Sequence, residues 1–286
     1  MASVSGIGGS DGTVAVRGKG RPVARWGLRF VALGYLLVLL AAPVAMVFYR
    51  AFQHGLGPVW SSLTTSEARS AIEVTLIVAI SAVVLNTVFG VGTALLLVRR
   101  RFPGRHLLDV LVDLPQAVSP IVVGLALILV YGKFGFFGSW IERNGIKIIF
   151  SLPGMALATA FVSLPLVVRS VAPVLAEIGD EQEQAARTLG ASSWQTFRRI
   201  TLPSIRDALA YGVVLSLARS LGEYGAVTVV SGHVIGKTLT LTLFIDERLE
   251  NFDQPAAYSA AVLLAIIAMG SLLISRRFRT RSRSAV

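Results

Sequence analysis

Long apolar segments recur along this chain of 286 residues, and they constrain its fold more than any other feature. A helix needs about 20 predominantly apolar residues to cross the hydrocarbon core of a bilayer. Segments of about that length lie at residues 30–49, 76–98, 109–131, 149–168, 208–230 and 256–275. In lipid, a helix satisfies its backbone hydrogen bonds within one segment, whereas an isolated strand does not. The sequence therefore predicts an all-α polytopic membrane protein with six transmembrane helices.

The composition agrees with a membrane location and argues against an enzyme. Hydrophobic residues make up 54% of the chain and charged residues 15%, a balance typical of membrane proteins. Cysteine is absent, which excludes disulfides and thiolate metal sites. The histidines, His54, His106 and His233, are scattered, and the motifs of metalloproteases and serine hydrolases are missing. We expect no catalytic residue, no metal and no cofactor bound by this chain.

Basic residues concentrate in alternate loops, which explains the formal net charge of +11. They cluster before the first segment, between the second and third, between the fourth and fifth, and after the sixth. The positive-inside rule places these clusters and both termini in the cytoplasm, so no nucleic-acid partner is needed. Residues 1–25 are predicted to be a disordered basic tail. Residues 26–276 then form the transmembrane domain, and residues 277–286 form a second basic tail.

A Gly-Lys-Thr sequence at residues 236–238 follows a Val-rich run and resembles part of a phosphate-binding P-loop. A P-loop has four residues between its first glycine and Gly-Lys, whereas Gly232 and Gly236 enclose three. The predicted topology also places this stretch on the outer face, where ATP is not available. We therefore expect no nucleotide site here and interpret the Val-rich run as the end of the fifth span.

The loop between the fourth and fifth spans has the pattern of two short helices. Asp180 and Glu183 have the spacing of a capping box, and Ser192 and Gln195 repeat it. Between them, Gly190 is a typical left-handed terminator of the first helix. A proline at position 203 is expected to end the segment before the fifth span.

Two interpretations of this loop remain open on physical grounds. Arg198 and Arg199 beside Trp194 and Phe197 suit an amphipathic hairpin lying on the membrane surface. The same aromatic residues, next to a face of small side chains, also suit a docking element for another protein, since such anchors dominate interfaces.

The loop resembles the EAA motif of ABC-importer permeases. That motif has two alanines, a glycine four residues after the second, then nine residues and Ile-x-Leu-Pro, found here as Ala185, Ala186, Gly190, Ile200, Leu202 and Pro203. Gln184 stands at the motif's glutamate position, with Glu183 beside it. The resemblance implies that these residues form coupling helices at about 181–202, which dock into a groove of a cytoplasmic ATPase subunit.

Residues 113–132, 217–243 and 258–265 extend the resemblance to sulfate and thiosulfate permease subunits of the CysW type. Paralogues of the CysT type and molybdate permeases share the Arg-x-x-Gly-Glu-[Tyr/Phe]-Gly pattern at residues 219–225, whereas residues 231–238 are closer to CysW. The resemblance covers about residues 30–275. It implies the type I, MetI-like permease fold in a bacterial inner membrane and the import of sulfate or thiosulfate.

The same resemblance implies a set of partners. They are a CysT-type permease subunit, two CysA-type subunits that bind ATP and Mg, an extracytoplasmic sulfate-binding protein and membrane lipid. Molybdate or another oxyanion is the alternative substrate, because nothing in the sequence measures the size of the anion. An ion-coupled secondary transporter is the alternative class, but such a protein has no need of a two-helix docking segment.

Two charged residues fall within the predicted fifth span. Arg219 and Glu223 are four residues apart, so they share a helix face and can pair. The pair either neutralises itself or lines the translocation path, because ionisable groups at membrane depth usually face a bundle interior or water.

The third span contains Pro115 and Pro120 on either side of Ser119. This pattern fits a simple kink or an interruption whose free N–H groups face an anion near the bilayer midplane. Ser119 therefore joins the two charged residues of the fifth span as a candidate for the path. Asp109 and Asp113 are expected to form structural ion pairs with the basic cluster that precedes this span.

Overall fold

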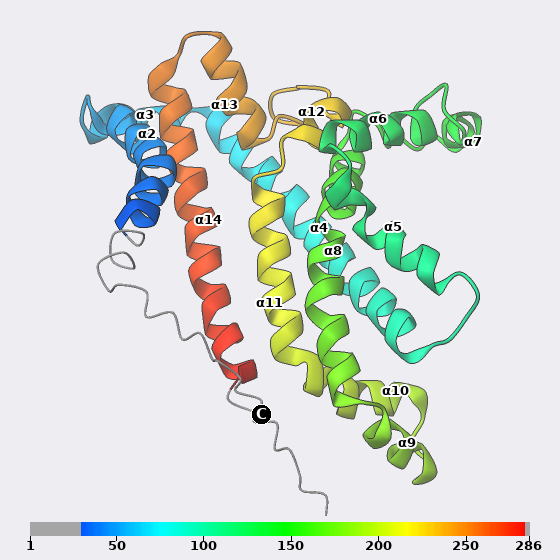
Figure 1. Ribbon diagram of the computed structural model, residues 1–286. Helices are drawn as coiled ribbons and strands as arrows, with labels where there is room; N and C mark the ends of the chain where they lie inside the picture. The colour runs from blue at the N-terminus through cyan, green and yellow to red at the C-terminus, as the bar shows by residue number, and fades with distance from the viewer. Residues whose placement is uncertain (1–29, 284–286) are drawn as a thin grey trace, which may run out of the picture. The chain divides into compact units, whose positions relative to one another are not determined.

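The computed structural model describes residues 30–283, with the backbone alone for residues 275–283, and every regular element in this range is helical (Figure 1). The helices long and apolar enough to cross a membrane are Phe30–Phe52, α4 (Ser66–Arg99), α8 (Leu152–Ile178), the run Ser193–Leu221 and α14 (Gln254–Arg283), tested over Gln254–Ile274. Counting α5 (Arg105–Ala117) and α6 (Pro120–Tyr131) as one bent span gives six. The prediction of an all-α polytopic protein is confirmed.

The other labelled elements of the described chain are either parts of these spans or short helices between them. They are the π-helical turn η1 (Leu37–Ala41), α2 (Ala42–Phe52), α3 (Leu56–Leu63), α7 (Gly138–Arg143), α9 (Glu181–Thr188), α10 (Ser193–Thr196), the π-helical turn η2 (Phe197–Thr201), α11 (Leu202–Leu221), α12 (Gly225–Val230) and α13 (Leu241–Glu250). The part of the first span up to Met46 belongs to a separate compact unit, and the second unit begins at Val47. Every residue from 30 to 46 is exposed. The predicted tail at residues 1–25 lies outside the described residues, whereas α14 extends to Arg283, into the second predicted tail.

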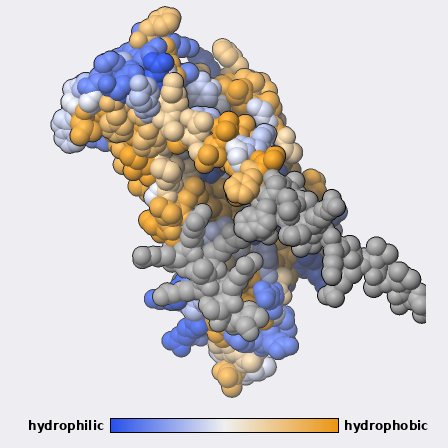
Figure 2. All heavy atoms as spheres, turned by 60° about the vertical axis from the view of Figure 1, so that its left-hand side comes forward, coloured by the Kyte–Doolittle hydropathy of each residue, from blue (hydrophilic) through white to orange (hydrophobic). Residues whose placement is uncertain are grey.

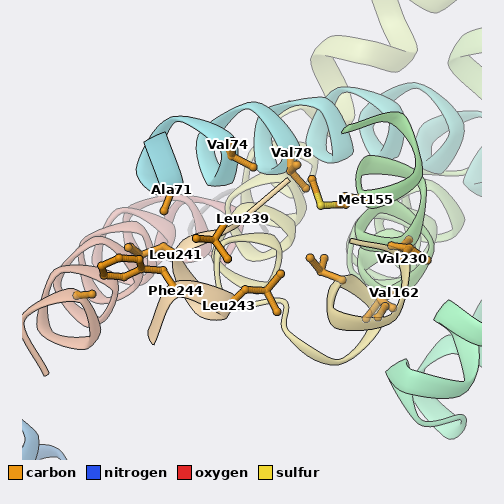
Figure 3. Packing of buried hydrophobic residues seen from close by; sticks show 14 of the residues in the cluster. Ala71, Val74, Val78, Met155, Val162, Val230, Leu239, Leu241, Leu243 and Phe244 are labelled. Atoms are coloured by element: carbon orange, nitrogen blue, oxygen red, sulfur yellow. The ribbon is translucent and has the colours of Figure 1, made fainter. Parts of the chain in front are cut away.

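Two separate apolar clusters hold the second unit together. Figure 3 shows the first, in which Val74 of α4 and Met155 of α8 pack with Phe244 of α13. The second cluster joins the later halves of α4 and α8 to α5 and the start of α11, with Val167 and Leu175 fully buried. Packing, rather than exclusion of water, is what holds helices together where their surroundings are lipid.

A buried polar group lies between the two apolar clusters along α4, α8 and α11. The side-chain amide of Asn86 donates to the hydroxyl oxygens of Ser163 at 2.8 Å and Ser216 at 3.1 Å. The Ser163 hydroxyl lies 3.2 Å from that of Ser220 and donates to the Thr159 carbonyl at 2.6 Å. Interhelical hydrogen bonds of this kind fix the register of packed membrane helices. The polar group therefore ties three spans together at one level.

The third span is interrupted rather than kinked. Its halves, α5 and α6, are bent by 118° at residues 118–119. Ser119 has φ −58° and ψ 135°, which is the extended conformation that a following proline imposes. Pro120 then begins α6, where a missing N–H costs no helical hydrogen bond.

The predicted fifth span, residues 208–230, is wrong as a single helix. α11 starts earlier and ends at Leu221, and α12 begins at Gly225. The Val-rich run is therefore a short separate helix and not the end of the long one. At the break, the Ala226 N–H donates to the Glu223 side chain at 2.9 Å, whereas in a continuous helix it would donate to a backbone carbonyl.

Apolar side chains remain exposed on the second unit. Ile80, Val84 and Phe89 of α4 are each more than half exposed, and Figure 2 shows hydrophobic residues across much of the visible face, with hydrophilic residues gathered in separate regions. Large exposed apolar areas indicate contact with lipid or with another protein.

A close contact between α6 and α12 supplies a test of how the helices pack. A Cβ added to Gly124 of α6 would lie 2.7 Å from the Val229 Cβ of α12, whereas one added to Gly270 of α14 would meet nothing within 4 Å. We expect Gly124→Ala to lower the free energy of unfolding by about 1–3 kcal/mol, because overpacking forces the helices apart. Gly270→Ala is the matched control and should leave it unchanged or slightly raised. Unfolding of both variants in bicelles measures this, and equal stabilities would contradict the packing described.

Candidate functional site

The segment between α8 and α11 forms two short helices separated by Gly190, as the sequence predicts. Gly190 has φ 85°, a left-handed conformation that glycine adopts without steric cost. The predicted capping box of α10 is confirmed, since the Ser192 hydroxyl accepts from the Gln195 N–H at 3.3 Å and the Gln195 side chain accepts from the Ser192 N–H at 2.8 Å. The left-handed turn at Gly190 ends the first helix and the capping box begins the second, so α9 and α10 are separate helices.

The second short helix does not end at a proline. α10, η2 and α11 follow one another without a break, and Pro203 lies in the first turn of α11. Proline lacks the N–H that a helical hydrogen bond needs. The π-helical turn η2, directly before α11, is a common way for a helix to continue past such a missing bond. The expectation that Pro203 separates the segment from the fifth span is therefore wrong, and the second short helix is continuous with a long span.

Arg99, the last residue of α4, joins the segment to two spans. It donates to the carbonyl oxygens of Leu175 at 2.9 Å and Gly179 at 2.6 Å, at the end of α8. It also pairs with the carboxylate of Glu183 on α9 at 3.2 Å. The same carboxylate oxygen accepts from the Thr201 hydroxyl at 2.9 Å. One buried cluster thus connects α4, α8, α9 and η2.

The capping box predicted for α9 is not formed. Asp180 is the N-cap residue but makes no side-chain cap hydrogen bond, and Glu183 turns inward to Arg99 instead of back to the helix start. Gln184, at the glutamate position of the motif, is exposed. The buried polar contact of this segment therefore comes from Glu183.

The outward side of the segment is apolar and unusually accessible. Leu189 is 88% exposed and Trp194 is 66% exposed, with the Trp194 ring stacked on Phe197 at a centroid distance of 5.6 Å. Of the other predicted coupling residues, Ala185, Gly190 and Pro203 are exposed and Ala186, Ile200 and Leu202 are half-buried. A large aromatic side chain held at this exposure is characteristic of a protein interface.

The two helix breaks meet each other. Gly225, which begins α12, lies against Pro120, which begins α6, so that a Cβ on Gly225 would come within 3.0 Å of the Pro120 Cβ. Gly124 and Val229 continue this contact along the two short helices. Ser119 is exposed at the junction, and its side chain makes no cap hydrogen bond. The interruptions of the third and fifth spans thus form one structural feature.

Arg219 and Glu223 pair across the break in the fifth span. Arg219 Nη1 lies 2.7 Å from Glu223 Oε2, and the Glu223 side chain is 2% exposed whereas that of Arg219 is 40% exposed. Glu223 Oε1 also accepts from the Ala226 N–H at 2.9 Å, and the Glu223 carbonyl accepts from the Thr242 hydroxyl at 3.0 Å. Glu223 holds the break together, while Arg219 retains donors toward the surface. Ser119 forms no hydrogen bond with this pair.

The prediction for Asp109 and Asp113 is wrong about their partner. Both carboxylates pair with Arg169 of α8, at 2.8 Å and 2.6 Å, and not with the basic cluster before α5. No local pattern indicates this pairing, because α5 and α8 are separated along the chain by the bend and by the intervening α6 and α7.

Sequence reasoning also missed a polar network near α13. Arg248 pairs with Glu67 at the start of α4 and lies 3.5 Å from Asp253, and the Tyr224 hydroxyl donates to Asp246 at 2.8 Å. Glu67 and Arg248 are 181 positions apart, and Tyr224 and Asp246 are 22 apart, so no local spacing indicates these two pairs.

The Gly-Lys-Thr stretch has no P-loop geometry. It follows the short helix α12 and not a strand. The Ser231 hydroxyl donates to the Thr238 carbonyl at 2.6 Å, and the Thr238 hydroxyl accepts from the Val234 N–H at 3.0 Å. These bonds close a compact turn from which Lys237 is exposed.

Comparisons with known proteins agree with this geometry. Residues 86–283 match the family described as binding-protein-dependent transport system inner membrane component. The chain is 49% identical over 252 residues to the sulfate transport system permease protein CysW of Synechocystis sp., covering 88% of this chain and 91% of that protein. It is 42% identical over 243 residues to the sulfate transport system permease protein CysT of Escherichia coli, covering 85% and 87%.

A solved structure shows the same fold at low identity. A chain of a bacterial ABC transporter involved in the import of the acidic polysaccharide alginate superposes with a TM-score of 0.75 at 17% identity, covering 91% of this chain and 96% of that one. The sequence match and the shared arrangement of helices lead to one conclusion. This chain belongs to the family of binding-protein-dependent transport system inner membrane components.

Proposed function

We propose that this chain is one membrane-spanning half of an ATP-driven importer of sulfate and thiosulfate. The observation that carries the coupling mechanism is the cluster of Arg99, Glu183 and Thr201, which fixes an accessible docking segment to the ends of two spans. The substrate assignment is supported by relatives at 49% and 42% identity that are named sulfate transport system permeases.

The proposed importer contains further subunits. They are a CysT-type permease that completes the pathway, two CysA-type subunits that bind ATP and Mg, and an extracytoplasmic sulfate-binding protein that docks on the outer loops. The alternation of basic loops supports a bacterial inner-membrane location with both termini in the cytoplasm. Residues 26–276 would form the transmembrane domain, flanked by basic tails at 1–25 and 277–286.

Coupling would pass through two connections. Because α10 continues through η2 into α11, a displacement of the docking segment moves the fifth span directly. Because Glu183 is joined to Arg99, the same displacement acts on the ends of α4 and α8. Closure of the ATPase subunits on ATP would therefore rock several spans together, and hydrolysis would reset them.

The anion path is proposed to pass the junction of the two helix breaks. Arg219 is the cation there, and a guanidinium presents a planar pair of donors suited to two oxygens of one oxyanion. Its pairing with Glu223 would weaken anion binding in this arrangement, which suits a site that must release its substrate. Ser119 adds an exposed hydroxyl at the same junction.

The docking role of the segment can be tested at Trp194. Trp194→Ala removes an exposed aromatic anchor, and we expect at least about a tenfold loss of ATPase-subunit retention because such anchors contribute about 2 kcal/mol or more. Trp60→Ala is the matched control, since Trp60 is 73% exposed on α3. Affinity purification of tagged permease followed by quantification of the bound ATPase subunits measures the effect. Equal retention in both variants would refute the docking assignment.

The coupling cluster can be tested at Glu183. Glu183→Gln keeps the size of the side chain but removes the charge that Arg99 requires, so the docking segment should still bind while its link to α4 and α8 weakens. We expect fewer anions transported per ATP hydrolysed, measured in proteoliposomes. Glu181→Gln changes an exposed carboxylate on the same helix and should leave this ratio unaltered. A normal ratio in Glu183→Gln would exclude this cluster from coupling.

Radiolabelled sulfate uptake tests the substrate. Cells lacking this subunit should regain uptake when the intact gene is restored, and excess thiosulfate should suppress that uptake whereas molybdate should not. Arg219→Gln should lower uptake while the complex still assembles, because a path cation is lost. If sulfate uptake did not depend on the gene, the permease assignment would stand, and the substrate would be another oxyanion.

A further inference from the structure

An open hollow of about 310 Å³ lies where α4 ends, beside α9 and α10. Its apolar part is lined by Gly92, Leu95 and Leu96 of α4 together with Phe197. Its polar part is lined by Arg99, Arg100, Arg187, the carboxylate residue Glu183 and Ser193, together with two threonines. The hollow is therefore amphipathic, with its hydrocarbon side toward the body of a span and its charged side at the end of that span.

The charged side carries an excess of positive charge. Arg99 is neutralised by Glu183, but Arg100 and Arg187 have neither an ion pair nor a side-chain hydrogen bond with any residue that the structure describes. Both are exposed. Two guanidinium groups that line one hollow without a carboxylate partner favour an anionic occupant, and a phosphodiester matches their paired donors.

We propose that this hollow binds an anionic phospholipid of the cytoplasmic leaflet, with the phosphate at Arg100 and Arg187 and an acyl chain along Gly92 and Leu96. Basic pockets between spans on the cytoplasmic side are suited to lipid headgroups. This inference rests on the proposed orientation, which places the end of α4 in the cytoplasm. Bound lipid would contact α4, α9 and η2 together and so stabilise the coupling cluster.

The apolar lining separates a lipid from the other possible occupants. A free phosphate or sulfate ion would use the arginines alone and gain nothing from Leu95 and Leu96. A segment of an ATPase subunit would reach the outward side of α9 and α10 first, where Leu189 and Trp194 are exposed. A molecule with an anionic head and a hydrocarbon tail uses both parts of the hollow.

Lipid retention by the purified transporter complex tests the proposal independently of transport. Native mass spectrometry would compare phosphatidylglycerol with phosphatidylcholine of the same acyl chains. Arg100→Gln should lower phosphatidylglycerol retention roughly fivefold, since one basic residue near an anionic headgroup contributes that order of affinity. The neighbouring Arg101 is exposed but does not line the hollow, so Arg101→Gln is its charge-matched control.

A second pair of variants tests the acyl-chain part without changing charge. A Cβ added to Gly92 meets nothing within 4 Å, and Gly92 lines the hollow, so Gly92→Leu should fill the hollow and displace lipid while the backbone is kept. Gly270→Leu, on an equally open helix surface, should retain it. Equal retention of the two lipids, or no difference between variants and controls, would overturn the proposal.

Two further outcomes would assign the hollow to another occupant and also overturn the proposal. Competition by inorganic phosphate, with binding unaffected in Gly92→Leu, would indicate a free-anion site. Loss of the ATPase subunits from Arg100→Gln with unchanged lipid would indicate a protein contact. Failure of sulfate uptake in the earlier experiment would not affect any of these readouts.

Discussion

The need to satisfy every backbone hydrogen bond away from water governs this structure. Two spans are broken, and a broken helix in lipid exposes N–H and C=O groups that must be covered by protein. Here the breaks pack against each other, because α6 and α12 meet at Gly124 and Gly225, where an added Cβ would lie 2.7 Å from the Val229 Cβ and 3.0 Å from the Pro120 Cβ. Glu223 supplies two acceptors at the break, one carboxylate oxygen to the Ala226 N–H and its carbonyl oxygen to the Thr242 hydroxyl. Helix packing and these hydrogen bonds together hold the two breaks in contact.

The buried charges follow the same logic at the other end of the bundle. Glu183 is nearly buried, and an isolated carboxylate there would be strongly destabilising. It is tolerated because Arg99 and Thr201 both bind it, and because Arg99 uses its other donors on the carbonyl oxygens at the end of α8. The hydrogen bonds and the ion pair of this cluster therefore connect α4, α8, α9 and η2. A polar layer around Asn86 plays a comparable part between the two apolar clusters.

Sequence alone predicted the class, the approximate spans, Gly190 as a left-handed terminator and the second capping box, since each depends on local pattern or on hydropathy. It failed where a distant residue decides the outcome. Glu183 was expected to cap α9 but is captured by Arg99, 84 positions earlier. Asp113 was expected to pair nearby but is held by Arg169, 56 positions later. Asn86, an amide within an apolar span, was a signal that could have indicated the buried polar layer.

The segment between α8 and α11 has two connections to the spans, and they differ in kind. The link through η2 into α11 is covalent and helical, so under the proposed coupling it would transmit rotation and translation along one axis. The link through Arg99 is a set of hydrogen bonds to α8 and an ion pair to α9, which can rearrange if the segment tilts. Motion of α11 relative to α4 and α8 would then act on the shared side-chain hydrogen bonds of Asn86, Ser163 and Ser216. Along α11, Ser216 lies between η2 and the break at residues 222–224, so under the proposed coupling a change in the register of these bonds would reach the residues around Arg219.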